Sequence, residues 1–154
     1  MLIFLDIDGV MIPAKGWQSL EVMDDGFPAF SARATHALRQ LLAEDVTVIL
    51  TTSHKDRFTL TEWKQIFSNR NIHISKLKSL PGNGPNLNRK QEIENWFHLN
   101  IPEEDFVILD DDKSLNELPE RLKHNLVQTS SHIGLTEEHV VNICSILNRE
   151  IAPV

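Results

Sequence analysis

The chain carries its most informative stretch close to residue 1: Leu2-Ile3-Phe4-Leu5-Asp6-Ile7-Asp8-Gly9-Val10. Its first four residues are all apolar, and Asp6 ends the run. A short continuous apolar run is typical of a strand that is buried on both faces, as in a parallel sheet. Two further runs, Val46 to Leu50 and Phe106 to Leu109, also end at polar residues and predict two more buried strands.

Segments with helical periodicity lie between these strands. Helices are predicted after the candidate N-cap Ser31, from the capping-box residue Thr59 to Phe67, around Ile93, and from about Thr136. Weaker strands are expected at residues 72–74 and 126–127. This alternation predicts an α/β fold, a three-layer Rossmann-like parallel sheet with helices on both faces. We expect residues 1–154 to form a single domain, since domains commonly contain about 100–150 residues.

Composition and charge exclude several classes of protein. The chain has 22 acidic and 15 basic residues, and its formal net charge of −7 argues against a coat protein of nucleic acids or anionic membranes. The single cysteine, Cys144, excludes an internal disulfide and a multi-cysteine zinc site. The short apolar opening has no basic lead-in and is expected to be neither a signal peptide nor a membrane span. We therefore expect a cytoplasmic protein that makes no membrane contact.

Acidic residues directly follow two of the predicted strands. Asp6 and Asp8 follow the first strand, and Asp110, Asp111 and Asp112 follow the strand at 106–109. Like charges this close repel unless they share a proton or a cation, although an acidic turn is the alternative at each place taken alone. If the two strands are neighbours, their carboxylates converge on an oxygen-rich pocket suited to Mg²⁺. Its candidate ligands are Asp6, Asp8, Asp110 and Asp111. The register of the triple Asp stays open, with Asp111 and Asp112 as the other pair.

Polar residues also follow the strand at 46–50, and a basic pair precedes the third helix. Thr51 and Thr52 offer hydroxyls and backbone N–H groups, which can hold phosphate oxygens at a strand end. Arg89 or Lys90 offers a cation that could neutralise a phosphoryl group or crowded carboxylates. Taken alone, each group is more often an ordinary turn or a solvated helix end, so their combination carries the prediction.

In this order the four groups resemble the motifs of haloacid dehalogenase (HAD) superfamily phosphohydrolases. The similar residues are Asp6-Ile7-Asp8-Gly9-Val10 for the first motif, Thr51 for the second, Arg89 or Lys90 for the third and Asp110-Asp111 for the fourth. More closely, the chain resembles the small HAD-type domains of multidomain RNA-repair proteins. That resemblance is carried by Thr52-Ser53-His54-Lys55, Arg89 with Glu92, Ile93 and Trp96, the triple Asp, and Gly134-Leu135-Thr136.

At two places the chain departs from the family motifs or matches them ambiguously. Relatives often carry Ser-Trp-Arg where this chain has Ser53-His54-Lys55, so a substrate-side contact is expected to differ. Lysine is the usual third-motif residue and favours Lys90, whereas the spacing to Glu92 in close relatives favours Arg89.

The resemblance implies a Mg²⁺-dependent phosphatase that forms an aspartyl-phosphate. Asp6 would be the nucleophile and Asp8 the general acid and base. The phosphate ligands would be Thr51, Thr52 and the cation Arg89 or Lys90. The metal would be held by Asp6, the Asp8 backbone carbonyl and Asp110 or Asp111.

The gaps between the motifs hold the predicted loops, helices and strands but no inserted cap domain. In this superfamily caps enclose small substrates, so the resemblance implies an open site. The phosphorylated substrate would then be large, such as a polynucleotide end or a phosphoprotein, unless a partner chain or a dimer covers the site. The irregular stretch from Val10 to Pro28, with Trp17, is a candidate flap.

Other functions compete with this interpretation. A receiver-type phosphoacceptor domain also combines an acidic pair, a hydroxyl and a lysine, but its phosphorylated Asp lies in mid-chain, where no Asp follows an apolar run here. A catalytically silent HAD-fold binding module would keep the fold without turnover. A phosphotransferase could use the same covalent intermediate.

Overall fold

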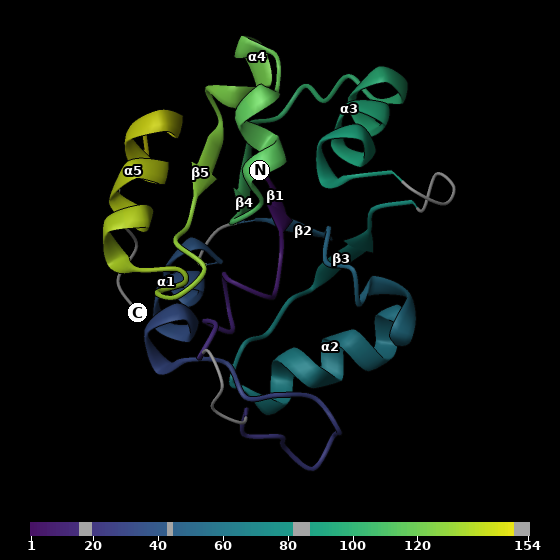
Figure 1. Cartoon of the computed structure of the whole chain (residues 1–154), viewed down its shortest axis with the longest axis vertical. Coiled ribbons are helices and arrows are strands. Elements are labelled where there is room, and N and C mark those ends of the chain that lie inside the picture. Colours follow the sequence, from purple (N-terminus) through teal and green to yellow (C-terminus); the bar gives the residue numbers. More distant parts are fainter. Residues whose placement is uncertain (16–19, 43–44, 82–86, 150–154) are drawn as a thin grey trace.

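The computed structural model describes residues 1–15, 20–42, 45–81 and 87–149 (Figure 1). In these residues, parallel strands form a five-stranded sheet in the order β3-β2-β1-β4-β5. The strands are β1 (Leu2–Leu5), β2 (Thr47–Leu50), β3 (Lys76–Ser79), β4 (Phe106–Asp110) and β5 (Leu126–Gln128). Within the central strand, Leu5 pairs with Leu50 on one side and Leu109 on the other. The first strand and the strand at 106–109 are therefore neighbours.

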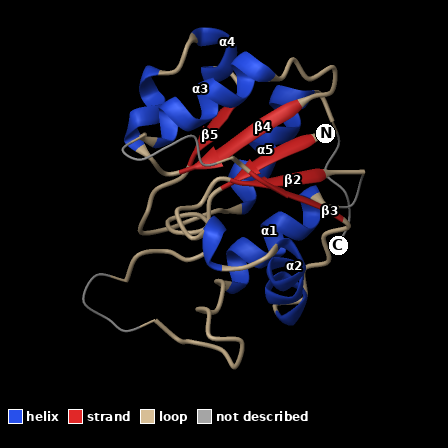
Figure 2. Cartoon of the chain, turned by 90° about the vertical axis from the view of Figure 1, so that its right-hand side faces the viewer, coloured by secondary structure: helices blue, strands red, loops and turns tan. Residues whose placement is uncertain are grey.

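Helices cover both faces of the sheet, because side chains alternate between the two faces along each strand (Figure 2). Ile3 and Leu5 pack on the face covered by α1 (Ala32–Leu41), α2 (Leu60–Asn69) and α5 (Glu137–Leu147). Leu2 and Phe4 pack on the other face, covered by α3 (Arg89–Leu99), α4 (Glu120–Lys123) and the 3₁₀ helix η2 (Lys113–Glu117). The predicted three-layer α/β fold is confirmed.

Two helices begin at the capping residues that the sequence indicates. The Ser31 hydroxyl accepts a hydrogen bond from the Ala34 N–H at 3.0 Å. Thr59 and Glu62 form a reciprocal capping box at the start of α2. These side chains supply acceptors and donors that a helix end otherwise lacks.

The third strand lies further along the chain than predicted. Residues 72–74 are expected as a strand, whereas β3 is Lys76–Ser79. Ile72 and Ile74 are buried in the core before the strand begins, so their apolar character reflects packing and not strand pairing. Lys76 and Lys78 are exposed at this sheet edge, as is common for edge strands.

The strand order places a crevice at the carboxyl ends of β1 and β4. From β1 the chain runs outward through β2 to β3 and then returns to the other side of β1 as β4. Ligands of open α/β sheets bind where the strand order reverses in this way. The order also differs from the 2-1-3-4-5 order of flavodoxin-like receiver folds, and this difference overturns the receiver alternative.

The described residues between these motifs show no separate cap domain. The connection from β1 to β2 holds a loop and α1, and that from β2 to α3 holds η1 (Lys55–Arg57), α2 and β3. Trp17, proposed for the flap, lies outside the described residues. Within the described ranges, no helix combines the length and apolar character needed to cross a bilayer.

Candidate active site

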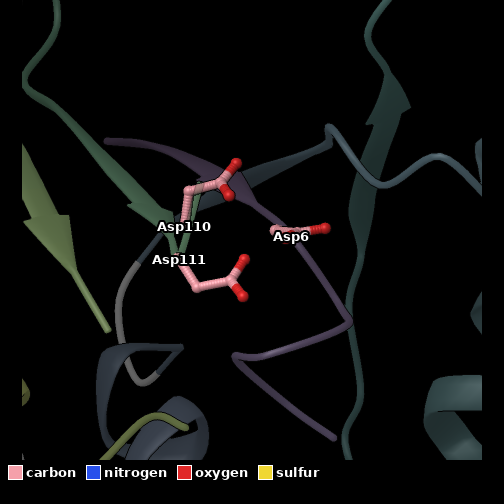
Figure 3. Close-up of side chains that lie close together, drawn as sticks. All are labelled: Asp6, Asp110 and Asp111. Carbon is pink, nitrogen blue, oxygen red and sulfur yellow. The ribbon is translucent and has the colours of Figure 1, made fainter. Parts of the chain in front are cut away.

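Three carboxylates meet at the carboxyl ends of β1 and β4 (Figure 3). Asp6 directly follows β1, Asp110 is the last residue of β4, and Asp111 follows it. One oxygen of each lies within 4.8 Å of the others. Asp6 is 5% exposed and Asp110 is fully buried, whereas Asp111 is half-buried. We refer to Asp6, Asp110 and Asp111 as the acid cluster.

The sheet itself brings Asp6 beside Asp110. The Asp6 N–H donates to the Leu109 carbonyl at 3.0 Å, which extends the β1–β4 ladder one residue beyond Leu5. The Thr51 N–H donates to the Leu5 carbonyl at 3.0 Å in the same way. Residues that follow neighbouring parallel strands therefore lie side by side without help from loops.

Gly9 makes room for the third carboxylate. Its φ is +79°, and a Cβ at this position would overlap the Asp111 side chain. The turn is held by the loop after β5, where the Thr129 hydroxyl donates to the Gly9 carbonyl at 2.7 Å. Nearby, the Leu135 N–H donates to the Val10 carbonyl at 2.8 Å. Glycine is required here both for the backbone conformation and for the close approach of Asp111.

Arg89 is the cation that faces the acid cluster. Its Nη1 lies 2.5 Å from Asp110 Oδ2 and 3.4 Å from Asp6 Oδ1, and it donates to Thr51 Oγ1 at 3.3 Å. Asn88 fixes this placement, because it caps α3 and makes Arg89 the first helical residue. Three carboxylates facing one guanidinium leave two negative charges uncompensated when all are ionised.

Lys90 does not share this position. Its Nζ pairs with Glu94 Oε1 at 2.8 Å, one turn further along α3. Successive residues of an α-helix point about 100° apart, so Arg89 and Lys90 face different directions. Of the two expected cations, the structure brings only Arg89 to the acid cluster.

Asp112 is also separate from the cluster. Its side chain caps η2 by accepting a hydrogen bond from the Ser114 N–H at 2.8 Å. Of the triple Asp, Asp110 and Asp111 are thus the two that face Asp6.

Burial raises the pKa values of two of these carboxyl groups. The pKa of Asp6 rises to about 9, first because burial disfavours the charged form and then because of the charge on Asp110. Burial likewise raises the pKa of Asp110, and Arg89 acts against this rise. For Arg89, burial acts to lower the pKa, but Asp110 and Asp6 outweigh it and the net change is upward. The cluster therefore retains a proton near neutral pH unless another cation replaces it.

The donor set of the acid cluster fits Mg²⁺. The grouped ligand atoms are carboxylate oxygens, which hard divalent cations prefer. A divalent ion would also balance the two charges that Arg89 leaves uncompensated. Asp6, Asp110 and Asp111 are therefore the residues that could hold it.

The two threonines after β2 have different surroundings. Both side chains are fully buried. The Thr51 hydroxyl lies against Arg89 at the acid cluster, whereas Thr52 Oγ1 accepts a hydrogen bond from the His54 N–H at 3.2 Å. Thr51 is placed toward the cluster, and Thr52 holds the turn that follows.

Asp8 is not one of the three grouped carboxylates, and its side chain is 57% exposed. Its Oδ2 lies 2.8 Å from His54 Nε2. The neighbouring Lys55 is buried and pairs with Glu92 at 3.0 Å. These His54 and Lys55 contacts were not predicted, although both residues follow Thr51 and Thr52 in the same strand-end loop.

A cleft of about 380 Å³ opens beside Asp8 and Asp111. Its other lining residues are Gly9, Ile12, Pro13, Ala14, Lys15, Leu20 and Ser131. The cleft gives a bound molecule access to the rim of the acid cluster.

Comparison with known proteins shows the family to which the chain belongs. Residues 2–140 match the family model described as the HAD domain in Swiss Army Knife RNA repair proteins. Among solved structures, the chain is similar to a Vibrio cholerae protein assigned as a 3-deoxy-D-manno-octulosonate 8-phosphate phosphatase. The identity is 14%, the match covers 95% of this chain and 82% of that chain, and the TM-score is 0.42. No curated protein matches the chain.

Proposed function

Because the chain belongs to the HAD domains of Swiss Army Knife RNA repair proteins, we propose that it is a Mg²⁺-dependent phosphatase that forms an aspartyl-phosphate. One observation carries this proposal: the acid cluster, Arg89 and Thr51 gather at the carboxyl ends of β1, β2 and β4. A carboxylate nucleophile, a metal site and phosphate-binding donors are thereby within reach of one phosphoryl group.

In the first half-reaction, Asp6 would attack the phosphorus of a bound phosphate ester. A new bond forms between an Asp6 oxygen and phosphorus, and the ester P–O bond breaks. The bond's electron pair stays on the leaving oxygen, which takes a proton from Asp8. Arg89 and Thr51 would donate hydrogen bonds to the phosphoryl oxygens. Asp6, Asp110 or Asp111 and the Asp8 carbonyl would hold Mg²⁺, which would supply the charge neutralisation that a carboxylate needs to approach a phosphate.

In the second half-reaction, Asp8 would act as a base. It takes a proton from a water molecule whose oxygen attacks the aspartyl-phosphate. The bond between phosphorus and Asp6 then breaks, inorganic phosphate leaves, and Asp8 is again protonated for the next turnover. The exposure of Asp8 at the rim of the cleft supports this role, because both the leaving group and the water must reach it.

We propose a phosphorylated polynucleotide end as the substrate. Two observations support a large substrate of this kind: the described residues show no separate cap, and the cleft beside Asp8 is open at the surface. The family description, which refers to RNA repair proteins, favours a nucleic acid over a phosphoprotein. That a partner chain or a dimer covers the site is a further prediction.

The test is a turnover assay with Mg²⁺ or EDTA on p-nitrophenyl phosphate, small phosphorylated metabolites, and oligonucleotides with a 3′- or a 5′-phosphate. We expect Mg²⁺-dependent phosphate release that is fastest on an oligonucleotide, and an acid-stable, hydroxylamine-sensitive phosphoprotein that Asp6→Asn lacks. Absence of turnover on every substrate would indicate the silent binding module. Turnover only of metabolites would contradict the proposed substrate class, and transfer to an added alcohol would identify a phosphotransferase.

A further inference from the structure

The carboxylate of Asp8 is held by a contact that the proposed chemistry does not require. His54 Nε2 lies 2.8 Å from Asp8 Oδ2, and the other ring nitrogen, Nδ1, lies 3.3 Å from Arg57 Nη1. We refer to Asp8, His54 and Arg57 as the His54 bridge. Asp8 and His54 come from the loops after two different strands, β1 and β2.

The partners of the imidazole fix its tautomer. A guanidinium has only N–H donors and stays charged, so His54 Nδ1 must accept the hydrogen bond from Arg57. The proton of a neutral imidazole then lies on Nε2, which donates to Asp8 Oδ2. The direction of both hydrogen bonds follows from this chemistry.

Aromatic side chains hold the bridge in place. The His54 ring packs edge-to-face on Phe27 with the centroids 5.7 Å apart. The Arg57 guanidinium lies 5.8 Å from the centre of the Phe27 ring and 5.3 Å from that of Phe58. The imidazole is therefore supported both through its nitrogens and through its ring, as a side chain that sets the orientation of another group must be.

We propose that His54 is a positioning residue for Asp8, an inference that rests on the proposed function. Because His54 occupies Oδ2, the remaining oxygen, Oδ1, is the one that exchanges a proton with the substrate. When the ester bond breaks, the Oδ1–H bond of Asp8 breaks and the proton joins the leaving oxygen. His54 keeps its Nε2–H throughout and touches neither the substrate nor the phosphorus.

The leaving group provides a readout that a purely structural role would not move. A p-nitrophenolate ion leaves readily without a proton, whereas an alkoxide, such as a sugar oxygen, needs one in the transition state. Loss of the correct Asp8 orientation should therefore slow alkyl phosphates more than aryl phosphates.

The experiment compares His54→Leu with His54→Gln, which retains an N–H donor at a similar reach. We expect His54→Leu to lower kcat for an alkyl phosphate about 10- to 100-fold and for p-nitrophenyl phosphate only a few-fold, since general acid catalysis contributes about 10²–10⁴. His54→Gln should restore most of the alkyl phosphate rate. In an Asp8→Asn background, His54→Leu should cause little further loss. His98→Leu, at the exposed end of α3, is the matched control for replacing a histidine.

Several outcomes would overturn this inference. Equal losses on both substrates, or a Gln variant no better than Leu, would show that His54 only supports the loop. Normal turnover by His54→Leu would reject the positioning role alone, while an inactive wild-type chain would reject the proposed function and this inference with it. Nitrogen NMR of the imidazole gives a check without turnover: an Nε2-protonated tautomer supports the inference and an Nδ1-protonated one overturns it.

Discussion

The acid cluster and the His54 bridge both hold carboxylates beside N–H donors at the same end of the sheet, yet they are built differently. Asp6 and Asp110 are placed by the backbone ladder of adjacent strands and are buried. Asp8 is placed by side-chain contacts between loops and is largely exposed. Charges interact more strongly in a buried site than at the surface, and an unpaired one is more harmful there. Changes in the acid cluster should thus affect both stability and catalysis, and changes in the bridge mainly catalysis.

The sharpest test of this difference is Asp6→Asn. Removing the nucleophile should lower kcat about 10⁴-fold or more, as for other covalent catalysts. The neutral amide should at the same time stabilise the metal-free fold at pH 8, because the raised pKa of Asp6 shows that its ionised form is disfavoured there. Turnover measured with Mg²⁺ gives the first effect, and thermal unfolding measured in EDTA gives the second. Glu117→Gln, an exposed acid on η2, is the control, and an active Asp6→Asn would contradict the assignment.

Arg89→Met is the next largest change. Its guanidinium contacts Asp6, Asp110 and Thr51, so its loss should lower kcat about 10²- to 10³-fold, as for the removal of a preorganised donor. Lys90→Met is the matched control on the neighbouring residue. It should change kcat by less than about twofold, because Lys90 pairs with Glu94 away from the acid cluster and an i,i+4 ion pair contributes little. Equal losses in the two variants would mean that α3 as a whole, and not Arg89, supports catalysis.

Sequence patterns predict the acid cluster well because strand ends determine it. Once the apolar runs at 2–5 and 106–109 are recognised as neighbouring strands, Asp6 and Asp110 must meet. The choice between Arg89 and Lys90 depends on where α3 begins, which the capping box of Asn88 decides. The sequence carries that signal as Asn88 followed three residues later by Gln91.

The His54 bridge could not be predicted in the same way. Its contact joins the loop after β1 to the loop after β2, and neither loop has a periodicity that fixes side-chain direction. The displaced third strand has a related cause, because the buried residues Ile72 and Ile74 resemble a strand in composition alone. The sequence therefore predicts which residues the sheet brings together, but it does not predict the side-chain contacts that join one loop to another.

The acid cluster and the His54 bridge should also differ in how they make the free energy of unfolding depend on pH and on Mg²⁺. In EDTA, the unfolded chain loses the Asp6 proton near the ordinary value of 3.8, whereas the folded chain keeps it up to about pH 9. The free energy of unfolding should therefore fall as the pH rises between these values, by at most about 1.4 kcal/mol per pH unit for one group. Because Mg²⁺ competes with this proton, its stabilising effect should grow with pH.

Thermal unfolding at several pH values, with and without Mg²⁺, measures both effects. Asp6→Asn should flatten the pH dependence and reduce the effect of Mg²⁺. His54→Leu, which lies outside the acid cluster, should leave both in place. A Mg²⁺ effect independent of pH would contradict the placement of the metal at Asp6.

The loop that carries Phe27 to the His54 bridge is itself fastened by an ion pair. Arg70, at the end of α2, pairs with Asp25 at 2.6 Å and donates to the carbonyls of Phe27 and Pro28 at 2.8 and 2.9 Å. The hydrogen bond from Arg70 is the main reason why the pKa of Asp25 lies below its usual range. This pair therefore connects the loop at 20–30 to the helix behind it.

Asp25→Asn should give the smallest of these effects. It removes a charge from a largely buried pair, so the free energy of unfolding at pH 7 should fall by about 1.5–3 kcal/mol, the range for hydrogen bonds to charged groups. Because the folded pKa of Asp25 is lowered, the stability that this pair contributes to the wild type is present above the unfolded pKa and is lost as the pH falls below about 4, whereas the variant has no such loss.

A looser Phe27 should lower kcat a few-fold with alkyl phosphates and less with aryl phosphates. Denaturant unfolding and the same pair of substrates measure this, with the exposed neighbour Asp24→Asn as control. Asp25→Asn could lower the free energy of unfolding and yet change kcat equally for alkyl and aryl phosphates. In that case the ion pair would stabilise the loop without affecting the His54 bridge, and Phe27 would not contribute to positioning Asp8.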